Sequence, residues 1–314
     1  MPNVIGEQDT RKLIDMDGAL KSVERIFRDR AAGKVRNLPR RRLSSRSRQL
    51  NVMAAWQRDR DLVCLRAYMG MANTITLYNG RSGEIILILN ARYLSSLRTG
   101  AASGVAARYL APKGAAVLGL IGTGKQAIYQ LEALVRTCRV ERALIFGRNR
   151  KRLKDFIARM SAHLDVEMSE CPSIEQIEEQ SDIIALATNS TVPVMEGARL
   201  KEKVLVITIG ANGPQRHEVS VNLIGRMDLV VTDDVPTAKG GSGDLIAACE
   251  AGILEWDKII PLEKIVAGPT TTARPGERIL FQSNGIADED LAVARYVMDQ
   301  VRRKGLKLKS IPGL

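Results

Sequence analysis

Residues that hold metal ions or disulfide bonds are scarce in this sequence. Its 314 residues include four cysteines and two histidines, and no two cysteines stand in C-x-x-C spacing. A zinc site or a disulfide framework needs several such residues at characteristic spacings. We therefore expect neither. The six residues are Cys64, Cys138, Cys171, Cys249, His163 and His217.

Long apolar runs are also absent. No stretch approaches the roughly 18 apolar residues that a membrane-spanning helix needs. Acidic residues, Glu7 and Asp9, stand near the start of the chain, where a signal peptide would have an apolar core. We expect no membrane partner and a cytoplasmic location.

Aromatic residues make up only 4% of the chain. Proteins that bind single-stranded nucleic acid stack the bases on aromatic side chains, and no nucleic-acid-binding motif is present, so we expect no nucleic-acid partner. A content of 45% hydrophobic and 26% charged residues is that of a globular protein. At roughly 100 to 200 residues per domain, the length favours two domains.

Positive charge is concentrated at one end of the chain. The formal net charge is +12, and residues 1–60 hold fifteen Lys or Arg against seven Asp or Glu. Residues 34–48 include seven basic residues and no acid. Such a run attracts phosphates or acidic ligands, or it is only a solvated cationic face. The charge pattern leaves both interpretations open.

The first third of the chain alternates between helical and strand patterns. Apolar residues at helical intervals predict one amphipathic helix over residues 12–31, and helical spacing returns over residues 91–110. Between them, short runs rich in Val, Ile, Leu and Tyr are separated by polar or glycine turns, which predicts an antiparallel meander. These runs are residues 50–56, 62–69, 74–79 and 84–90.

After Pro112 the pattern becomes strand, helix, strand. Apolar strands are predicted at 116–121, 143–146, 183–187, 204–209 and 278–283, and helices at 125–135, 150–162 and 287–304. Alternation of this kind predicts a parallel sheet with helices on both faces. The fold class is therefore α/β: a Rossmann-type, doubly wound domain, accompanied by an α+β domain with antiparallel strands.

A glycine-rich turn joins the first of these strands to its helix. Gly122, Gly124 and Ala127 form G-x-G-x-x-A. In this context Gly122 allows the tight turn, Gly124 lets the backbone approach a pyrophosphate, and Ala127 lets the helix pack closely on the strand. The helix start, at Lys125 and Gln126, offers N–H groups and a positive dipole end to the phosphates. The turn predicts a dinucleotide site.

The end of the second strand indicates which dinucleotide binds. Gly147-Arg148-Asn149-Arg150 stands where NAD-binding proteins have an acid that accepts from the ribose hydroxyl. Guanidinium groups instead grip a 2′-phosphate in bidentate fashion. We predict that Arg148, Asn149 and Arg150 favour NADP(H), with NAD(H) possible; the alternative is that the two arginines only decorate a helix start.

Several segments, taken in order, resemble the ornithine cyclodeaminase and mu-crystallin family. They are LSSLRTGAASGVAARYLAP, VLGLIGTGKQA, IIALATNSTVPVM, ITIGANGPQRHEVSV, the SGDL element at 242–245 and FQSNGIADEDLAVA. The resemblance implies a homodimer. It also implies a substrate-binding and dimerisation domain, residues 1–113 with 286–314, and a nucleotide-binding domain, residues 114–285.

The resemblance also implies site residues. Arg98 matches the family arginine that binds the substrate carboxylate, and Arg41 offers a second one, although Arg40 or Arg42 could take its register. The nicotinamide would lie beside Ala187, Thr188 and Asn189 and beside Ser283 to Gly285.

Two positions depart from the family pattern. Arg66 stands where the family usually has lysine, and arginine stays protonated, so it could orient a carbonyl or carboxylate but could not act as a general base. Asn212 stands where cyclodeaminases have aspartate, and an amide can hydrogen-bond to an amine but cannot accept its proton. Both remain candidate catalytic residues. For the proton step, His217, Asp233, Asp234 and Asp244 are open alternatives.

These departures argue against ornithine cyclodeamination but not against hydride transfer. We predict an NAD(P)H-dependent oxidoreductase that transfers hydride at the carbon next to the carboxylate of a small imino, oxo or amino acid. The alternatives are a cyclodeaminase with relocated catalytic groups and a non-catalytic nucleotide-binding protein.

Overall fold

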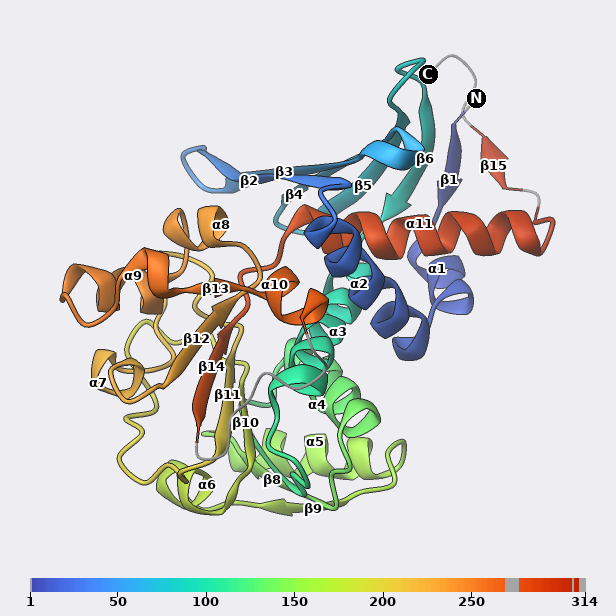
Figure 1. Cartoon of the computed structure of the whole chain (residues 1–314). Helices are drawn as coiled ribbons and strands as arrows, with labels where there is room; N and C mark the ends of the chain where they lie inside the picture. The colour runs from blue at the N-terminus through green and yellow to red at the C-terminus, as the bar shows by residue number, and fades with distance from the viewer. Residues whose placement is uncertain (1, 269–276, 307, 311–314) are drawn as a thin grey trace. The chain divides into compact units, whose positions relative to one another are not determined.

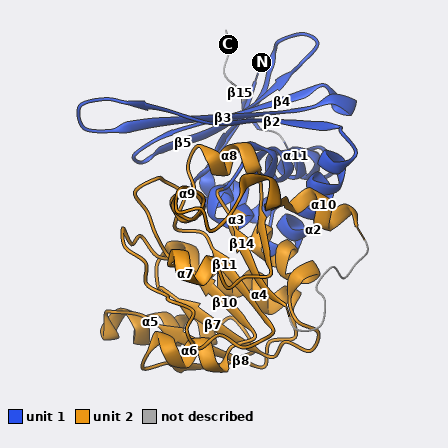
Figure 2. Cartoon of the chain, turned by 60° about the vertical axis from the view of Figure 1, so that its left-hand side comes forward, with its two compact units in different colours: residues 1–98, 285–314 blue, residues 99–284 orange. Residues whose placement is uncertain are grey.

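The computed structural model describes residues 2–268, 277–306 and 308–310. The chain forms two compact units, residues 1–98 with 285–314 (unit 1) and residues 99–284 (unit 2), coloured separately in Figure 2. The functional division predicted above, 1–113 with 286–314 and 114–285, stays a prediction about roles. One parallel and one largely antiparallel sheet confirm the predicted fold class.

Unit 1 is built on a seven-stranded sheet in the order β15-β1-β6-β5-β4-β3-β2. Neighbours from β3 to β6 pair antiparallel, as the predicted meander requires. The strand β2 also pairs antiparallel with β3, whereas β1 runs parallel to β6. The strands are β1 (Asn3–Ile5), β2 (Val35–Ser44), β3 (Gln49–Gln57), β4 (Leu62–Met69), β5 (Ala72–Asn79), β6 (Ile85–Asn90) and β15 (Lys309–Ser310).

The basic run is itself a strand, which the sequence patterns missed. The strand β2 makes up most of this run, and within the described part of the chain it is an edge strand that pairs with β3 alone. Arginines suit this place because charged side chains on an edge strand oppose pairing with another chain.

Helices cover one face of this sheet. They are α1 (Glu7–Leu13), α2 (Met16–Ala31) and α11 (Ala287–Arg303), with a 3-10 turn η1 at Arg58–Arg60. The predicted start of the helix over 12–31 was wrong. The helix α1 ends at Leu13, and α2 begins at Met16 after Asp15, which caps it by accepting from the Gly18 N–H at 2.9 Å. In Figure 1, α11 runs beneath the strands and beside α2.

The two faces of the meander differ in burial. In one row across β3, β4, β5 and β6, Met53, Arg66, Ile75 and Leu89 are in register and buried. In the adjacent row, Ala54, Leu65, Thr76 and Ile88 are in register and only partly buried. Because α11 packs on these strands, the buried row faces it.

Unit 2 contains an eight-stranded parallel sheet in the order β13-β12-β14-β11-β10-β7-β8-β9. The strands are β7 (Val117–Ile121), β8 (Arg142–Phe146), β9 (Glu167–Glu170), β10 (Ile183–Leu186), β11 (Val204–Thr208), β12 (Leu229–Thr232), β13 (Ile260–Pro261) and β14 (Arg278–Gln282). The order reverses between β7 and β10. Such a reversal is where doubly wound sheets bind ligands.

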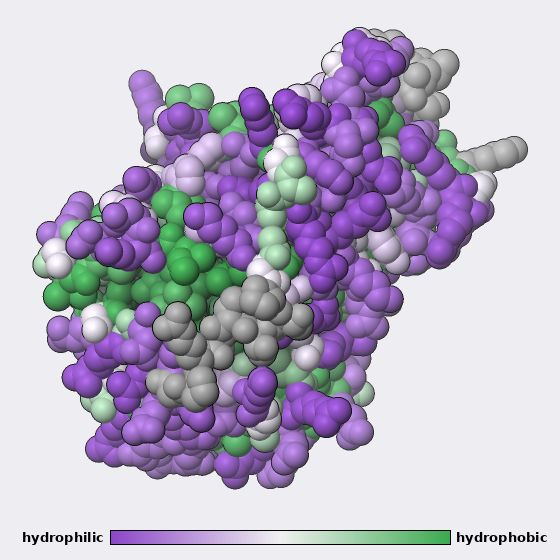
Figure 3. Space-filling view, viewed as in Figure 1, coloured by the Kyte–Doolittle hydropathy of each residue, from purple (hydrophilic) through white to green (hydrophobic). Residues whose placement is uncertain are grey.

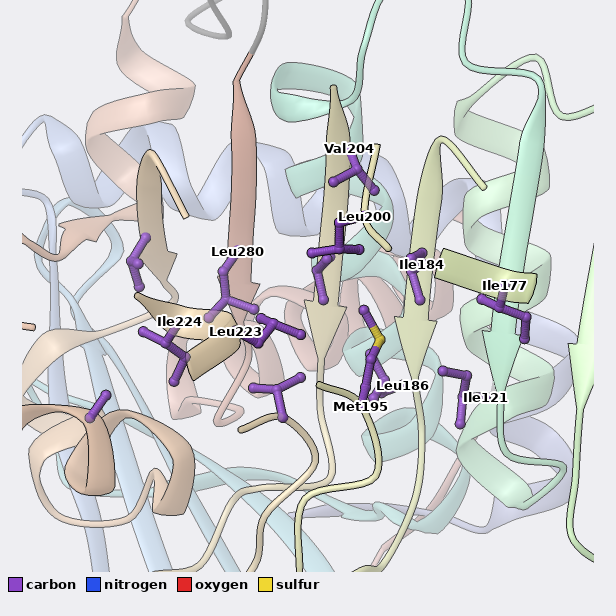
Figure 4. Packing of buried hydrophobic residues seen from close by; sticks show 14 of the residues in the cluster. Ile121, Ile177, Ile184, Leu186, Met195, Leu200, Val204, Leu223, Ile224 and Leu280 are labelled. Carbon is purple, nitrogen blue, oxygen red and sulfur yellow. The ribbon is translucent and has the colours of Figure 1, made fainter. Parts of the chain in front are cut away.

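The helices of unit 2 surround this sheet. They are α4 (Lys125–Thr137), α5 (Arg150–Ser161), α6 (Ile174–Gln180), α7 (Val221–Ile224), α8 (Val235–Lys239), α9 (Gly243–Glu250) and α10 (Leu262–Ala267), with a 3-10 turn η2 at Trp256–Lys258. The helix α3 (Arg92–Leu110) crosses the boundary between the units. Figure 4 shows apolar side chains of the core, among them Ile121, Ile184 and Leu280, packed against the strands.

The visible surface in Figure 3 is mostly hydrophilic, with an apolar area on unit 2. Ile246, Leu254 and Trp256 line a hollow beside α9. Of the helices in the described residues, none has the length and apolar character to cross a bilayer.

Candidate cofactor and substrate sites

The turn after β7 requires glycine at its first position. Gly122 has φ +113°, and a Cβ atom there would lie 2.5 Å from the carbonyl oxygen of Ala187. Its N–H donates to the Phe146 carbonyl at 2.9 Å, so the turn is also tied to the end of β8. The three loops that follow β7, β8 and β10 therefore meet at Gly122.

The start of α4 can accept an anion. Gly124 is the N-cap, and it has no side chain with which to cap the first N–H groups. Among the described residues, none would lie within 4 Å of a Cβ atom on Gly124. Gly124 and Lys125 are exposed, Gln126 is half-buried and Ala127 is buried beneath them. This arrangement fits a pyrophosphate at a helix N-terminus.

The end of β8 carries a concentrated positive charge. Arg148, Asn149 and Arg150 are all exposed, and Asn149 caps α5 by accepting from the Arg152 N–H at 2.9 Å. Arg150 lies 3.8 Å from Glu170. With Lys151, Lys154 and Asp155, it lines an open pocket. Positively charged side chains in the first turn of a helix are repelled by the positive end of the helix dipole. A bound anion would reduce this repulsion.

A buried glutamate, which the sequence patterns did not single out, joins the loops after β10 and β11. Glu218 is fully buried and accepts from the Thr188 N–H at 2.6 Å and the Thr188 hydroxyl at 2.8 Å. It also accepts from the N–H groups of Ile209 at 3.0 Å and Gly210 at 2.6 Å. Ala187 and Thr188 are half-buried here, whereas Asn189 is exposed.

A second buried acid joins the loops after β12 and β14. Asp233 accepts from the Asn284 N–H at 2.7 Å and from the Ser283 hydroxyl at 3.4 Å. Ser283 is therefore buried and tied to the sheet edge. The carboxyl ends of the parallel strands are thus fixed by buried carboxylates.

Asn212 and His217 lie in the loop after β11. Asn212 is exposed, and its amide donates to the Ile209 carbonyl at 3.4 Å. His217 is half-buried, with Nδ1 3.4 Å from Asp244, whose carboxylate also accepts from the Glu218 N–H at 3.1 Å. Burial raises the pKa of Glu218 to about 7, although its hydrogen bonds oppose the rise. Burial, and then the charge of Glu218, raises the pKa of Asp244 to about 8.

In unit 1, Arg66 and Arg98 share one carboxylate. Arg66 donates to both oxygens of Asp290 at 3.1 Å, and Arg98 donates to Asp290 at 3.0 Å and to Glu289 at 2.8 Å. All four side chains are buried. Although burial lowers the pKa of Arg98, Asp290 and Glu289 raise it above its ordinary value.

The remaining donors of Arg66 are also engaged. Its Nε donates to Asn73 at 3.2 Å and Nη2 donates to the Ser95 hydroxyl at 2.8 Å, while its guanidinium lies over the Tyr68 ring at 4.7 Å. Arg66 is therefore held in one orientation.

The structure indicates which arginine of β2 lies near Arg66 and Arg98. Arg41 is exposed, whereas Arg40 donates to the Gly285 carbonyl at 2.9 Å. A bulge between Leu38 and Arg41 changes which side chains of β2 turn toward α11. Burial lowers the pKa of Arg40, and the charges of Arg98 and Arg66 act in the same direction. Arg40, rather than Arg41, lies with the other two arginines.

Comparison with known proteins assigns the family. Residues 2–305 match the model of the ornithine cyclodeaminase/mu-crystallin family. An alanine dehydrogenase from Archaeoglobus fulgidus is 31% identical over 98% of both chains. The chain belongs to the ornithine cyclodeaminase/mu-crystallin family.

Solved structures agree with this assignment. A Thermococcus litoralis Δ1-pyrroline-2-carboxylate reductase in complex with NADH and L-proline superposes with a TM-score of 0.92, at 27% identity over 98% of this chain and 100% of that one. An archaeal alanine dehydrogenase dimer with bound NAD gives 0.91, at 28% identity over 100% and 99%. These relatives confirm the predicted class, an NAD(P)-dependent oxidoreductase.

Proposed function

We propose that the protein reduces the C=N bond next to the carboxylate of a small imino acid, with NAD(P)H as hydride donor, and catalyses the reverse oxidation of the amino acid. The observation that carries this proposal is the convergence of Arg40, Arg66 and Arg98 in unit 1. Burial lowers the pKa of Arg40, and the charges of Arg42, Arg98 and Arg66 lower it further. A substrate carboxylate would place a compensating negative charge beside these arginines. Two of the relatives are an alanine dehydrogenase and a Δ1-pyrroline-2-carboxylate reductase, which are named for small molecules with one carboxylate.

The residues divide into roles. Arg98 and Arg40 bind the substrate carboxylate, because a guanidinium pairs with it in bidentate fashion. Arg66, fixed by Asp290, stabilises negative charge near the reacting centre, and Asn212 hydrogen-bonds to the substrate nitrogen. Residues 1–113 with 286–314 serve the substrate and the dimer, and residues 114–285 serve the cofactor.

The test compares two neighbouring arginines. Arg40→Gln should raise KM for the imino acid at least about tenfold, the equivalent of about 1.4 kcal/mol, and leave KM for NADPH unchanged. Arg41→Gln, one residue along the same strand but exposed, is the matched control and should behave as wild type. Equal effects of the two substitutions would contradict the assignment of Arg40 to the carboxylate.

We further propose that NADP(H) is the preferred cofactor. The support is the exposed group of Arg148, Arg150, Lys151 and Lys154 at the start of α5, where the first turn has no acid. A 2′-phosphate would compensate these charges.

Titration of each dinucleotide tests this preference. Arg148→Asp should reverse the order, so that NADH binds more tightly than NADPH. Arg159→Asp, in the last turn of the same helix, should not change it. Tighter binding of NADH by the unmodified protein would refute the preference.

A further inference from the structure

Glu218 joins the two loops that follow β10 and β11. Its four hydrogen bonds come from Thr188, Ile209 and Gly210, which directly follow β10 and β11. Its carboxylate therefore ties the two loops together, in addition to the backbone hydrogen bond from the His217 N–H to the Ser190 carbonyl at 3.1 Å.

The residues around the Glu218 carboxylate hold it in place. A Cβ atom on Gly210 would lie 2.5 Å from the Glu218 carboxylate and would collide with the Thr188 carbonyl, so only glycine allows the carboxylate to approach. On the other side, Asp244 accepts from the Glu218 N–H at 3.1 Å and holds the backbone at this position. The carboxylate is thus fixed from both directions.

The direction of the cofactor follows from the sheet. In a doubly wound sheet the pyrophosphate lies at the first glycine turn, and the adenosine ribose lies at the end of the second strand, here β8. The nicotinamide half must then extend to the other side of β7, where β10 and β11 end. The loops joined by Glu218 are the ones on that side.

We propose that Glu218 is a positioning residue that fixes the nicotinamide-binding loops after β10 and β11. It acts through Thr188 and Gly210 and does not itself contact the substrate. The inference rests on the proposed nucleotide site. Within that site, it distinguishes Glu218, which shapes the nicotinamide end, from the residues that bind the phosphates.

The substitution Glu218→Gln tests the proposal at nearly constant shape. A glutamine presents an N–H₂ group to donors that need an acceptor, so part of the connection between the two loops is lost. Glu178→Gln is the matched control: Glu178 is also buried in unit 2 and accepts from the N–H groups of Gly197 at 2.7 Å and Arg199 at 2.9 Å. It lies near the end of α6, which precedes β10, and therefore at the opposite edge of the sheet.

The readout is affinity for whole cofactors and for the same molecules without nicotinamide. We expect Glu218→Gln to weaken NADPH and NADH at least about tenfold while ADP-ribose and its 2′-phosphate bind within about twofold of wild type. Glu178→Gln should bind all four ligands as wild type does. A purely structural role would weaken the fragments as much as the dinucleotides.

The binding measurements distinguish an error in the proposed nucleotide site from an error in the role of Glu218. If the wild-type protein bound none of the four ligands, the proposed nucleotide site itself would be wrong. If wild type bound them and Glu218→Gln weakened all four equally, or none, the site would stand and the role of Glu218 would be refuted.

Discussion

At the scale of single residues, unit 1 depends on arginines that are shared between stability and binding. Arg98 compensates two fully buried carboxylates, Glu289 and Asp290. A buried carboxylate that loses its partner is strongly destabilising. Arg98 therefore stabilises the fold independently of any substrate that it binds.

Two substitutions of Arg98 distinguish its role in stability from its role in substrate binding. Arg98→Ala should lower the free energy of unfolding by about 3–5 kcal/mol, because it leaves buried charges unpaired. Arg98→Lys keeps the charge but loses the bidentate geometry, so it should fold, bind NADPH normally, and lose about a hundredfold in kcat/KM, which corresponds to about 2.7 kcal/mol. Wild-type kinetics of Arg98→Lys on the imino acid would show that the fork geometry is not used.

The pair of Glu218 and Asp244 predicts a pH dependence of stability. Their folded pKa values, about 7 and about 8, lie above the ordinary values of 4.5 and 3.8. Between about pH 4 and pH 8 the folded state therefore binds more protons than the unfolded chain, and stability falls as pH rises through this range.

Urea unfolding at several pH values measures this dependence. The decrease toward pH 8 should be smaller in Asp244→Asn than in wild type, because the amide does not ionise. An unchanged slope in this variant would contradict the assignment of the dependence to the pair.

Sequence patterns identify residues well only where local chemistry is specific. The glycine turn and Arg98 could be proposed from motifs, but the choice among Arg40, Arg41 and Arg42 depends on a bulge in β2 that no local pattern reveals. Glu218 and Asp290 were missed because their partners, Thr188 and Arg66, are distant in sequence. The three consecutive acids Asp288, Glu289 and Asp290, which are followed directly by the apolar residues LAVA, were an available signal of buried pairing.

At the scale of elements, the turn between β7 and α4 separates two uses of glycine. Gly122 has a positive φ and a carbonyl oxygen close to where a Cβ would stand, so the fold itself requires it. Gly124 has ordinary extended geometry and open space. Only a ligand would require glycine at that second position.

Two alanine substitutions test this difference. Gly122→Ala should cost roughly 1–3 kcal/mol through backbone strain, which lowers the melting temperature by several degrees. Gly124→Ala should melt as wild type does yet bind NADPH at least about tenfold more weakly. A Gly124→Ala protein with unchanged NADPH affinity would remove the pyrophosphate from this turn.

The predicted elements were most accurate where periodicity was regular. The meander and the helices α3, α4, α5 and α11 were anticipated within a few residues. The strand β2 was missed because its many arginines obscure the alternation, and the break before α2 depends on one capping residue, Asp15. The sequence also predicts a loop rich in Gly, Pro and Thr over residues 268–276. Beyond Gly268, this segment lies outside the described residues.

At the scale of the whole molecule, one face of the meander in unit 1 is only partly buried. The row Ala54, Leu65, Thr76 and Ile88 lies on the face opposite the buried row that α11 covers. A related alanine dehydrogenase is a dimer. We propose that this face forms the interface of a homodimer.

Light scattering after gel filtration tests the interface. Leu65→Glu places a charge in the middle of the row and should halve the measured mass. Arg81→Glu, in the exposed turn after β5, should leave the mass unchanged. A Leu65→Glu protein that keeps the wild-type mass would place the interface elsewhere.

The central claim, NAD(P)H-dependent reduction of a small imino acid, is tested most directly by the loss of NADPH absorbance with a panel of substrates. We predict turnover with Δ1-pyrroline-2-carboxylate or with pyruvate plus ammonia, faster with NADPH than with NADH. Ornithine with NAD(P) should give no proline, because Arg66 and Asn212 cannot accept the amine proton. Steady formation of proline and ammonia from ornithine, or tight NADPH binding without oxidation by any imino or oxo acid, would contradict the account.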